Sequence, residues 1–211
     1  MKSLFPNGPL ARFFSLLLVI SCTACASGPS GEAMLRPVPQ RLPTLRAQGD
    51  LVIATLAGAT VTVESLTDKG LDDYYARRPA LINPFKQRPK GTKGPLAFIL
   101  RIQNVGQNRV NFDPGQALLV DQQNRRSAVL LYDELYSLFS EKAESAKVLR
   151  TLDETVLTNL LVVPPKVDRE GLLLFPPLDS EAKMVILEVG SFYIGSTEQL
   201  LLFEFEVRRS P

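Results

Sequence analysis

The sequence contains no histidine among its 211 residues. Imidazole is the general base of Ser-His-Asp hydrolases and the commonest protein ligand of zinc, copper and haem iron. Its absence excludes that catalysis, histidine acid–base chemistry and histidine-ligated metals. We therefore expect a non-enzymatic protein that holds no metal and no cofactor.

Cysteine is almost as scarce, because the chain holds only Cys22 and Cys25. Both lie before the part of the chain that could form a core. That part consequently has no disulfide, no thiolate metal site and no cysteine nucleophile. Tryptophan is absent as well, which excludes the Cys–Trp–Cys core of antibody domains.

The N-terminal residues have the pattern of an export signal. Lys2 and Arg12 supply positive charge, and the eight uncharged residues Phe13–Ile20 follow. Spanning a bilayer takes about 20 apolar residues, whereas a charged start, a short apolar stretch and a small residue before the cut are typical of signal peptides. We predict a signal peptide over residues 1–21.

Cys22 is the predicted lipidation site. The residues before it, Val19-Ile20-Ser21, are aliphatic, aliphatic and small, which is the order of a lipobox. Cys25 is the alternative, although Cys22 stands where an aliphatic residue is expected before it. An ordinary secretory signal, cut near residue 24 or 26, is the other interpretation that stays open.

The pattern resembles the signal of bacterial lipoproteins, whose cysteine carries a diacylglyceryl group and often an N-acyl chain. Two or more acyl chains anchor a protein stably, whereas one gives only marginal binding. Thr23, not aspartate, follows Cys22, as in lipoproteins sorted to the outer membrane. In a double-membraned bacterium, this resemblance implies a lipid-anchored protein of the outer membrane that faces the periplasm.

Charge is balanced once the signal peptide is removed. The whole chain has 24 Lys and Arg against 22 Asp and Glu, and the loss of Lys2 and Arg12 leaves 22 of each. No global field attracts a polyanion. We expect no nucleic-acid partner.

Cleavage before Cys22 leaves 190 residues, which suits one domain. Residues 22–47 are rich in Pro, Gly and Ser and contain few large apolar residues. Such a composition buries too little surface to offset chain entropy. We therefore predict a lipidated cysteine with a disordered tether over residues 22–47 and a folded domain over residues 48–211.

Short alternating apolar segments recur along that domain, separated by turn residues. We predict strands at residues 51–56, 60–64, 96–104, 109–112, 116–121, 128–131, 171–175, 184–189 and 199–207. In the last segment, Glu204 and Glu206 alternate with apolar residues, which predicts a wet outer face. Many short strands with frequent turns are typical of an antiparallel β-sandwich.

The hydrophobic period changes to that of a helix over residues 132–162. Leu131, Leu135 and Leu138 lie at helical spacing, and Leu152 and Val156 continue it. This pattern predicts two amphipathic helices, or one bent helix, that end at Pro164-Pro165. The apolar stripe packs on the sheets or, alternatively, on a partner.

Four segments carry a resemblance to a protein family: Phe98–Asn104, Val110–Phe112, Ala117–Asp121 and Gly171–Pro176. They resemble small bacterial envelope lipoproteins with an immunoglobulin-like β-sandwich, and the similarity covers about residues 50–207. It implies a mainly β, immunoglobulin-like antiparallel sandwich with an interaction or structural role and no catalytic residue. The helical insertion at about 132–162 departs from the family.

A basic run is the candidate contact for an anionic partner. No acid lies between Arg77 and Asn111, and the stretch holds eight cations with aromatic residues beside them. The candidate contacts are Tyr74, Tyr75, Arg77, Arg78, Phe85, Lys86, Arg88, Lys90 and Lys93. They could bind a lipid headgroup, a glycan or an acidic protein. The alternative is a solvated loop whose aromatic side chains fold back onto the sandwich.

Two acidic groupings are further candidate sites. Asp68, Asp72 and Asp73 could bind calcium, but they lack the spacing of a calcium loop, so an acidic turn is the plainer interpretation. Glu204 and Glu206 could form a carboxylate pair for glycoside hydrolysis, although surface glutamates are the default.

The sequence therefore predicts a membrane-anchored, non-catalytic binding or assembly module with an envelope protein as its partner. Recognition of anionic lipid or glycan by the basic loop at 77–93 is one alternative. A carboxylate hydrolase of envelope polymers is the other.

Overall fold

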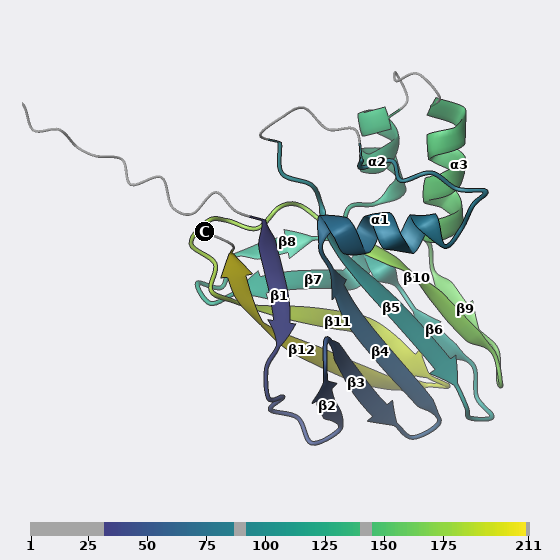
Figure 1. Cartoon of the computed structure of the whole chain (residues 1–211). Coiled ribbons are helices and arrows are strands. Elements are labelled where there is room, and N and C mark those ends of the chain that lie inside the picture. Colours follow the sequence, from purple (N-terminus) through teal and green to yellow (C-terminus); the bar gives the residue numbers. More distant parts are fainter. Residues whose placement is uncertain (1–31, 87–91, 140–144, 210–211) are drawn as a thin grey trace, which may run out of the picture.

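Two antiparallel sheets face each other, and helices pack over one of them (Figure 1). The computed structural model describes residues 32–86, 92–139 and 145–209. The protein is mainly β, a sandwich with helical segments, as the strand pattern predicts.

Sheet A has the order β1-β12-β11-β6-β9, with β7 also paired to β11 and β8 paired to β7. Its strands are β1 (Ala33–Pro37), β6 (Val110–Phe112), β7 (Ala117–Asp121), β8 (Arg126–Ala128), β9 (Leu161–Val163), β11 (Met184–Ile194) and β12 (Thr197–Arg209). A short 3-10 turn, Pro114–Gln116, leads from β6 into β7.

Sheet B has the order β10-β5-β4-β3-β2. Its strands are β2 (Leu45–Gln48), β3 (Leu51–Leu56), β4 (Ala59–Leu66), β5 (Leu96–Asn104) and β10 (Asp168–Phe175). Every pairing in the two sheets is antiparallel, so the register alternates side chains between an inner and an outer face.

The main core lies between the sheets and is rich in phenylalanine. Phe98 of sheet B packs edge-on against Phe175, with ring centroids 5.8 Å apart, and reaches across to Phe205 of sheet A at 5.5 Å. Phe112 and Phe192 form a second pair within sheet A, 6.1 Å apart. The first pair is edge-to-face and the other two are tilted, and aromatic pairs at such distances stabilise beyond the area they bury.

A second core lies between the outer face of sheet B and the helices. Ala97, Ile99, Leu172 and Leu174 point outward from β5 and β10 and are nonetheless buried. The helices that cover them are α1 (Asp68–Ala76), α2 (Tyr132–Phe139) and α3 (Ser145–Thr155). Two buried faces explain why β5 and β10 read as near-continuous apolar runs.

Local side chains start the first two helices. The Thr67 hydroxyl accepts a hydrogen bond from the Gly70 amide at 3.1 Å, as an N-cap does. At the start of α2, the Glu134 carboxylate accepts one from the Leu131 amide at 2.8 Å, which is the reciprocal half of a capping box.

The apolar stripe of the helices at 132–162 packs on sheet B, as the first of the two interpretations predicts, and not on a partner. Leu135, Phe139, Val148 and Leu152 are all buried there. The boundaries differ from the expected 132–162, because α3 ends at Thr155 and residues 161–163 form β9. Pro164-Pro165 therefore follows a strand.

The expected tether over residues 22–47 is wrong for residues 33–47, and the remainder up to residue 31 lies outside the described residues. β1 pairs with β12 over five residues and β2 pairs with β3 over four. Each of these two strands inserts one leucine into the main core: Leu35 of β1 is 5% exposed and Leu45 of β2 is 6% exposed. The Ser65 hydroxyl of β4 also donates to the Leu35 carbonyl at 3.0 Å. Folded structure thus starts well before residue 48.

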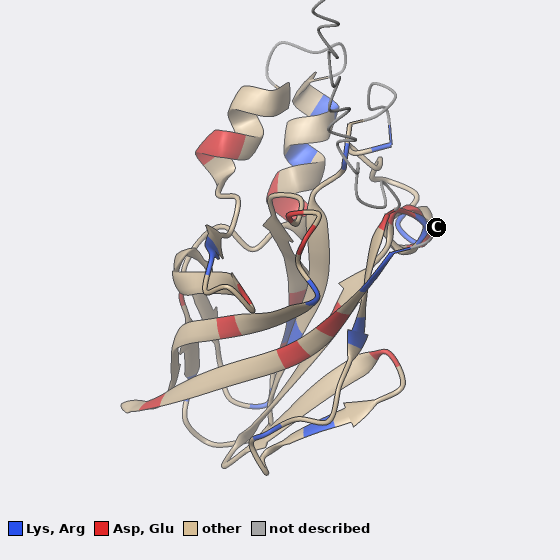
Figure 2. Ribbon diagram, turned by 90° about the vertical axis from the view of Figure 1, so that its left-hand side faces the viewer, with Lys and Arg blue, Asp and Glu red and all other residues tan. Residues whose placement is uncertain are grey.

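Three glycine turns meet at one end of the sandwich, which we call the distal end. The Gly106 amide donates to the Gly58 carbonyl at 2.7 Å, and Gly58 and Gly195 have positive φ angles of 97° and 65°. A Cβ on Gly106 would lie 2.9 Å from the Gly58 oxygen, so the backbones approach too closely for a side chain. The start of β1 and helices α2 and α3 lie at the opposite end, the helical end, in both ribbon views (Figures 1 and 2).

Candidate functional site

The aromatic residues of the basic run are buried and do not form a contact surface. Tyr74 and Tyr75 lie on α1 with exposures of 2% and 3%, and Phe85 is 4% exposed. Their rings pack in the second core, where Phe85 meets Phe139 edge-on at 5.6 Å. These three residues fold back onto the sandwich, as the alternative interpretation of the loop predicts, and the expectation that they bind a partner is wrong.

Burial changes the ionisation of the two tyrosines. Burial raises the pKa of Tyr75, and the hydrogen bond of 3.1 Å between its hydroxyl and that of Thr155 only partly opposes this. Burial likewise raises the pKa of Tyr74, against the influence of the nearby Arg78. Both phenols are therefore neutral structural groups near neutral pH.

Arg78 serves the fold. Its guanidinium lies 3.7 Å from the centroid of the Tyr74 ring and donates to the Tyr74 carbonyl at 2.8 Å. It also pairs with the Glu170 carboxylate at 2.9 Å. The basic run has no acidic residue nearby in the sequence, and Glu170 of β10, 92 residues further along the chain, supplies the acidic partner of Arg78.

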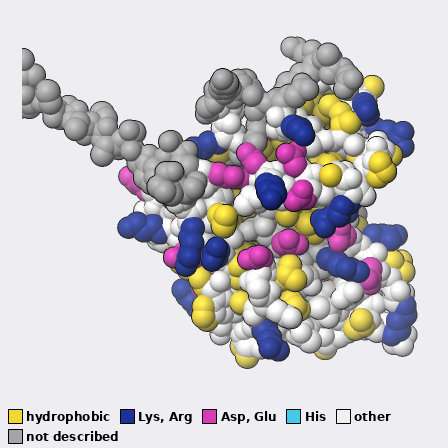
Figure 3. Space-filling model, in the orientation of Figure 1, with side chains coloured by type: hydrophobic (Ala, Val, Ile, Leu, Met, Phe, Trp, Pro, Cys, Tyr) yellow, Lys and Arg dark blue, Asp and Glu magenta, His cyan; other side chains and the backbone are white. Residues whose placement is uncertain are grey.

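The other described cations of the run do not form one patch. Arg101 pairs with Asp168 at 3.1 Å, and Arg77, Lys86, Lys93 and Arg109 are exposed on separate segments. Arg88 and Lys90 lie outside the described residues. The face seen in Figure 3 carries basic and acidic side chains interspersed, with no continuous basic area.

The acidic candidates do not gather into a metal site either. The Asp72 carboxylate accepts a hydrogen bond from the side-chain amide of Asn83 at 2.7 Å, and the backbone amide of Asp68 donates to the Glu32 carboxylate. Asp73 is exposed on α1. Within the described ranges, no group of three or more acidic, cysteine or histidine side chains is placed to hold a metal ion.

Glu204 does not lie on a wet face, which corrects the expectation for β12. It is 6% exposed, because residues 38–41 run over it. The Gln40 side chain donates to the Glu204 carbonyl and accepts from the Glu204 amide, both at 3.0 Å. Arg41 pairs with its carboxylate at 3.2 Å. The Gln40 amide therefore continues the β1–β12 ladder as one more strand residue would. Glu206 is engaged by Arg208 at 3.0 Å.

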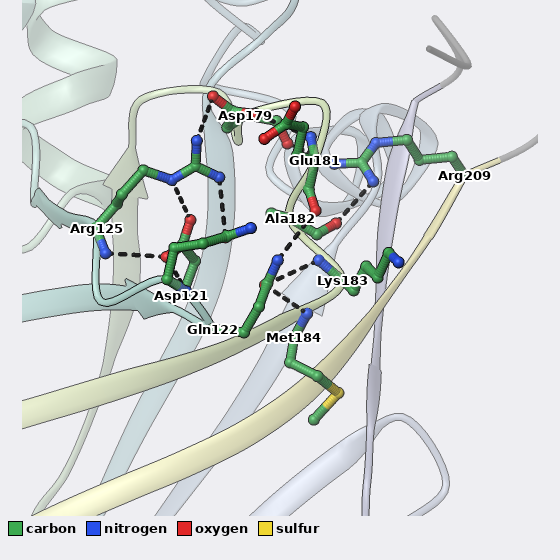
Figure 4. Close-up of polar contacts among 10 residues, drawn as sticks. Asp121, Gln122, Arg125, Asp179, Glu181, Ala182, Lys183, Met184 and Arg209 are labelled. Carbon is green, nitrogen blue, oxygen red and sulfur yellow. Dashed lines mark hydrogen bonds and ion pairs between the residues drawn. The ribbon is translucent and has the colours of Figure 1, made fainter.

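A polar cluster joins the β7–β8 turn to the segment before β11 (Figure 4). Arg125 bridges Asp121 and Asp179 at 2.6 and 2.7 Å. Gln122 accepts from the Lys183 and Met184 amides at 3.0 and 3.2 Å. Partial desolvation would raise the pKa of Asp121, but hydrogen bonds from the Arg125 backbone and side chain and the Gln123 amide outweigh it, so the pKa is lowered.

Two hollows flank this cluster. One, of about 240 Å³, lies where the described chain begins and is lined by Glu32, Asp68, Lys93 and Arg209 among others. The other, of about 310 Å³, is lined in part by Asp121, Arg125 and Asp179. Pro177 and Leu178 line both. The charged groups of the second hollow pair with one another, and in the first Arg209 donates to the Ala182 and Asp179 carbonyls, which suits a structural joint better than a ligand pocket.

The outer face of sheet A is different, because aliphatic side chains remain partly exposed there. Two cross-strand rows lie on it, Leu118–Glu188–Leu202 and Val120–Ile186–Glu204. Leu118, Val120, Ile186 and Leu202 all keep intermediate exposure, and Leu200 on the same face is 56% exposed. We call Leu118, Val120, Ile186, Glu188, Leu200 and Leu202 the open face.

Glu188 stands in the middle of the open face between two leucines, and no ion pair links it to another described residue. Figure 2 shows acidic residues along β11 and β12 of this sheet. An aliphatic surface around one available carboxylate fits a protein surface with apolar side chains and a cation. Sequence reasoning missed this face, although aliphatic residues at the outward positions of β7, β11 and β12 were its visible signal.

α2 also exposes more apolar surface than the fold uses. Tyr132, Tyr136 and Leu138 are 36%, 46% and 55% exposed, and the two tyrosine rings lie 6.1 Å apart. They flank the buried Leu135 and Phe139 on the same helix. The apolar arc of α2 is thus wider than its contact with α3 and sheet B.

The predicted lipidation sites Cys22 and Cys25 lie outside the described residues. In the part that is described, no helix is both long and apolar enough to cross a bilayer. The chain matches no protein-family model, no curated protein and no solved structure.

Proposed function

We propose that the protein is a lipid-anchored, non-catalytic binding module of the bacterial envelope, and that its open face docks a protein partner. The observation that carries the docking surface is the open face itself. The outer face of β5 and β10 in sheet B is covered by helices, whereas the aliphatic rows of sheet A remain partly exposed. Contiguous exposed apolar patches in soluble domains usually mark interaction sites.

The chemistry of the open face defines the partner. Leu118, Val120, Ile186 and Leu202 supply apolar contact, and Glu188 at the centre favours a partner with a lysine or arginine facing it. Charge at the centre of an interface acts mainly on specificity and association rate. A highly anionic ligand fits this surface poorly.

The anchor rests on the N-terminal pattern. A lipobox ending in Cys22 follows a charged start and a short apolar stretch, and a second lipidation signal is not needed where one cysteine carries several acyl chains. The protein is then held at a membrane surface, where it recruits or positions the partner. The outer membrane, facing the periplasm, is the location we propose for a double-membraned host.

Site-specific photocrosslinking in living cells tests the docking surface. A photoreactive residue is placed at Ile186 on the open face and, as a matched control, at Thr62, which lies half-buried on β4 of sheet B. We expect one dominant protein adduct from position 186 that disappears when Glu188→Arg is added, and no such adduct from position 62. The same adducts at both positions, or an adduct indifferent to Glu188→Arg, would refute docking on the open face.

Membrane fractionation tests the anchor separately. Cys22→Ala should release the protein from membranes, whereas the matched variant Cys25→Ala should leave it membrane-bound and lipidated. Release by Cys25→Ala alone would move the anchor to that cysteine. Retention of a Cys22→Ala, Cys25→Ala double variant would overturn lipid anchoring altogether.

A further inference from the structure

The described chain begins at the helical end and is fixed there. Ala33 pairs with Arg209, the last residue of β12. Just before it, the Glu32 carboxylate accepts a hydrogen bond from the Asp68 amide at the start of α1. The path from the predicted anchor therefore reaches the domain at this end (Figure 1).

The connection to the anchor is short. Glu32 is ten residues from Cys22, and ten residues reach about 35 Å at most. The 13 residues of β12 run from the Gly195 turn at the distal end to Arg209 at the helical end, a distance of about 40 Å. A bilayer at Cys22 therefore lies within reach of the helical end, whereas even a fully extended connection falls short of the distance to the distal end.

Among the described residues, the exposed aromatic side chains lie at the helical end. Of the five tyrosines in the sequence, Tyr74 and Tyr75 are buried and Tyr193 is half-buried, whereas Tyr132 and Tyr136 are exposed. The last two lie one helical turn apart on α2. Tyrosine concentrates at membrane–water interfaces, because its ring is apolar and its hydroxyl remains hydrated.

The charges of α2 indicate the kind of contact. Asp133 and Glu134 lie in its first turn, so an anionic headgroup layer would repel this part of the helix. The two tyrosines therefore contact the membrane by burying their rings at the level of the headgroups, and not by charge attraction. The strength of this contact should depend little on salt concentration.

We infer that the anchored domain stands with its helical end against the bilayer, and that Tyr132 and Tyr136 of α2 contact the lipid interface. The inference rests on the lipid anchor of the proposed function. It also turns the open face of sheet A, which lies along the side of the sandwich, toward the space beside the membrane, where a protein partner can reach it.

Depth-dependent fluorescence quenching tests the orientation. The mature lipoprotein, purified with its lipid and carrying Cys25→Ser, receives a single environment-sensitive fluorophore through Tyr136→Cys. The matched control is Val105→Cys at the distal end, where the native side chain is 57% exposed against 46% for Tyr136. Both are reconstituted into phosphatidylcholine vesicles with or without a lipid that carries a shallow nitroxide, and flotation confirms attachment.

We expect about twofold or stronger quenching at position 136, as for a group about 5–10 Å into the headgroup boundary, and none at position 105. Adding Tyr132→Ser should weaken the quenching at 136, and raising the salt concentration should not.

Equal quenching at both positions, or none at 136 in protein that floats, would overturn the inference. The inference would also be overturned if the fluorescence at position 136 changed with the amount of protein per vesicle and not with the nitroxide lipid. A second copy of the protein, and not the lipid, would then cover α2. Protein that fails to float refutes the anchor and this inference with it, whereas a failed crosslinking experiment on the open face leaves the orientation standing.

Discussion

Sheets A and B are built from similar antiparallel strands, yet the outer face of β5 and β10 in sheet B and that of β11 and β12 in sheet A have opposite environments. The outward residues Leu172 and Leu174 of sheet B are completely buried under helices. The outward residues Ile186 and Leu202 of sheet A keep intermediate exposure. The same residue type, leucine, is thus core in one sheet and surface in the other. Apolar content alone therefore says little about which face of a strand is available to a partner.

The largest expected effect comes from placing one charge on each outer face. Leu172→Lys buries an ammonium group between sheet B and α3, and we expect it to destabilise the domain by about 4 kcal/mol or more. Leu202→Lys puts the same group on the open face opposite Glu188, and should change stability by only about 0.5 kcal/mol. Urea denaturation of both variants measures the difference. Similar losses in the two would show that the open face is covered by the protein itself.

A core truncation should be nearly as costly, since the two sheets share one core. Phe98→Ala removes a ring that contacts both Phe175 and Phe205, and we expect a loss of about 3–5 kcal/mol. The matched change Leu200→Ala on the open face removes a side chain that is 56% exposed and should cost well under 1 kcal/mol. A small effect of Phe98→Ala in thermal and urea unfolding would mean that the sheets do not share a core.

Alkaline pH should weaken the helical layer of sheet B in particular. Burial raises the pKa of Tyr75, so the unfolded chain releases this proton near its ordinary pKa of about 10, while the folded protein still holds it. The stability from the neutral phenol is therefore complete below pH 10 and is lost as pH rises above it. Unfolding free energies measured from pH 8 to 11 should fall more steeply for the wild type than for Tyr75→Phe. At neutral pH the same variant loses one hydrogen bond, to Thr155, for about 1 kcal/mol.

Much of the sandwich could be predicted from the sequence because its central strands follow simple patterns. β4, β11 and β12 alternate between core and surface, and β5 carries a long apolar run. The strands that were missed lack such patterns. β1 and β2 contribute Leu35 and Leu45 and otherwise depend on pairing with distant partners. A composition rich in proline therefore indicated a tether where tertiary pairing forms edge strands.

The candidate site was harder to predict, because it depends on contacts between distant residues. The basic run is uniform in sequence, yet Arg78 and Arg101 find acids on β10. Tyr74 and Tyr75 could not be assigned to core or surface without knowing that α2 and α3 return to cover them. The open face was missed for the opposite reason. Its aliphatic residues alternate with core residues as expected for strands, but the sequence does not show that no described helix packs over them.

The smallest expected effect concerns the one outward residue of sheet A that is buried. Glu204 is covered by residues 38–41, and Arg41 pairs with it at 3.2 Å. The Arg41 side chain is 79% exposed, and ion pairs with an exposed partner contribute about 0–1 kcal/mol. Arg41→Ala should therefore cost less than about 1 kcal/mol. Gln40→Ala should cost about 1–3 kcal/mol, because it leaves the buried Glu204 amide without its partner, although the Glu204 carbonyl keeps a hydrogen bond from the Val38 amide at 3.3 Å. If urea denaturation ranked these two variants in the reverse order, the charge pair would be holding the segment, and the strand-like pairing of Gln40 would be incidental. The expected order would instead show that this part of sheet A is closed by backbone-like hydrogen bonding, and that the neighbouring row around Glu188 remains open because no described segment runs over it in the same way.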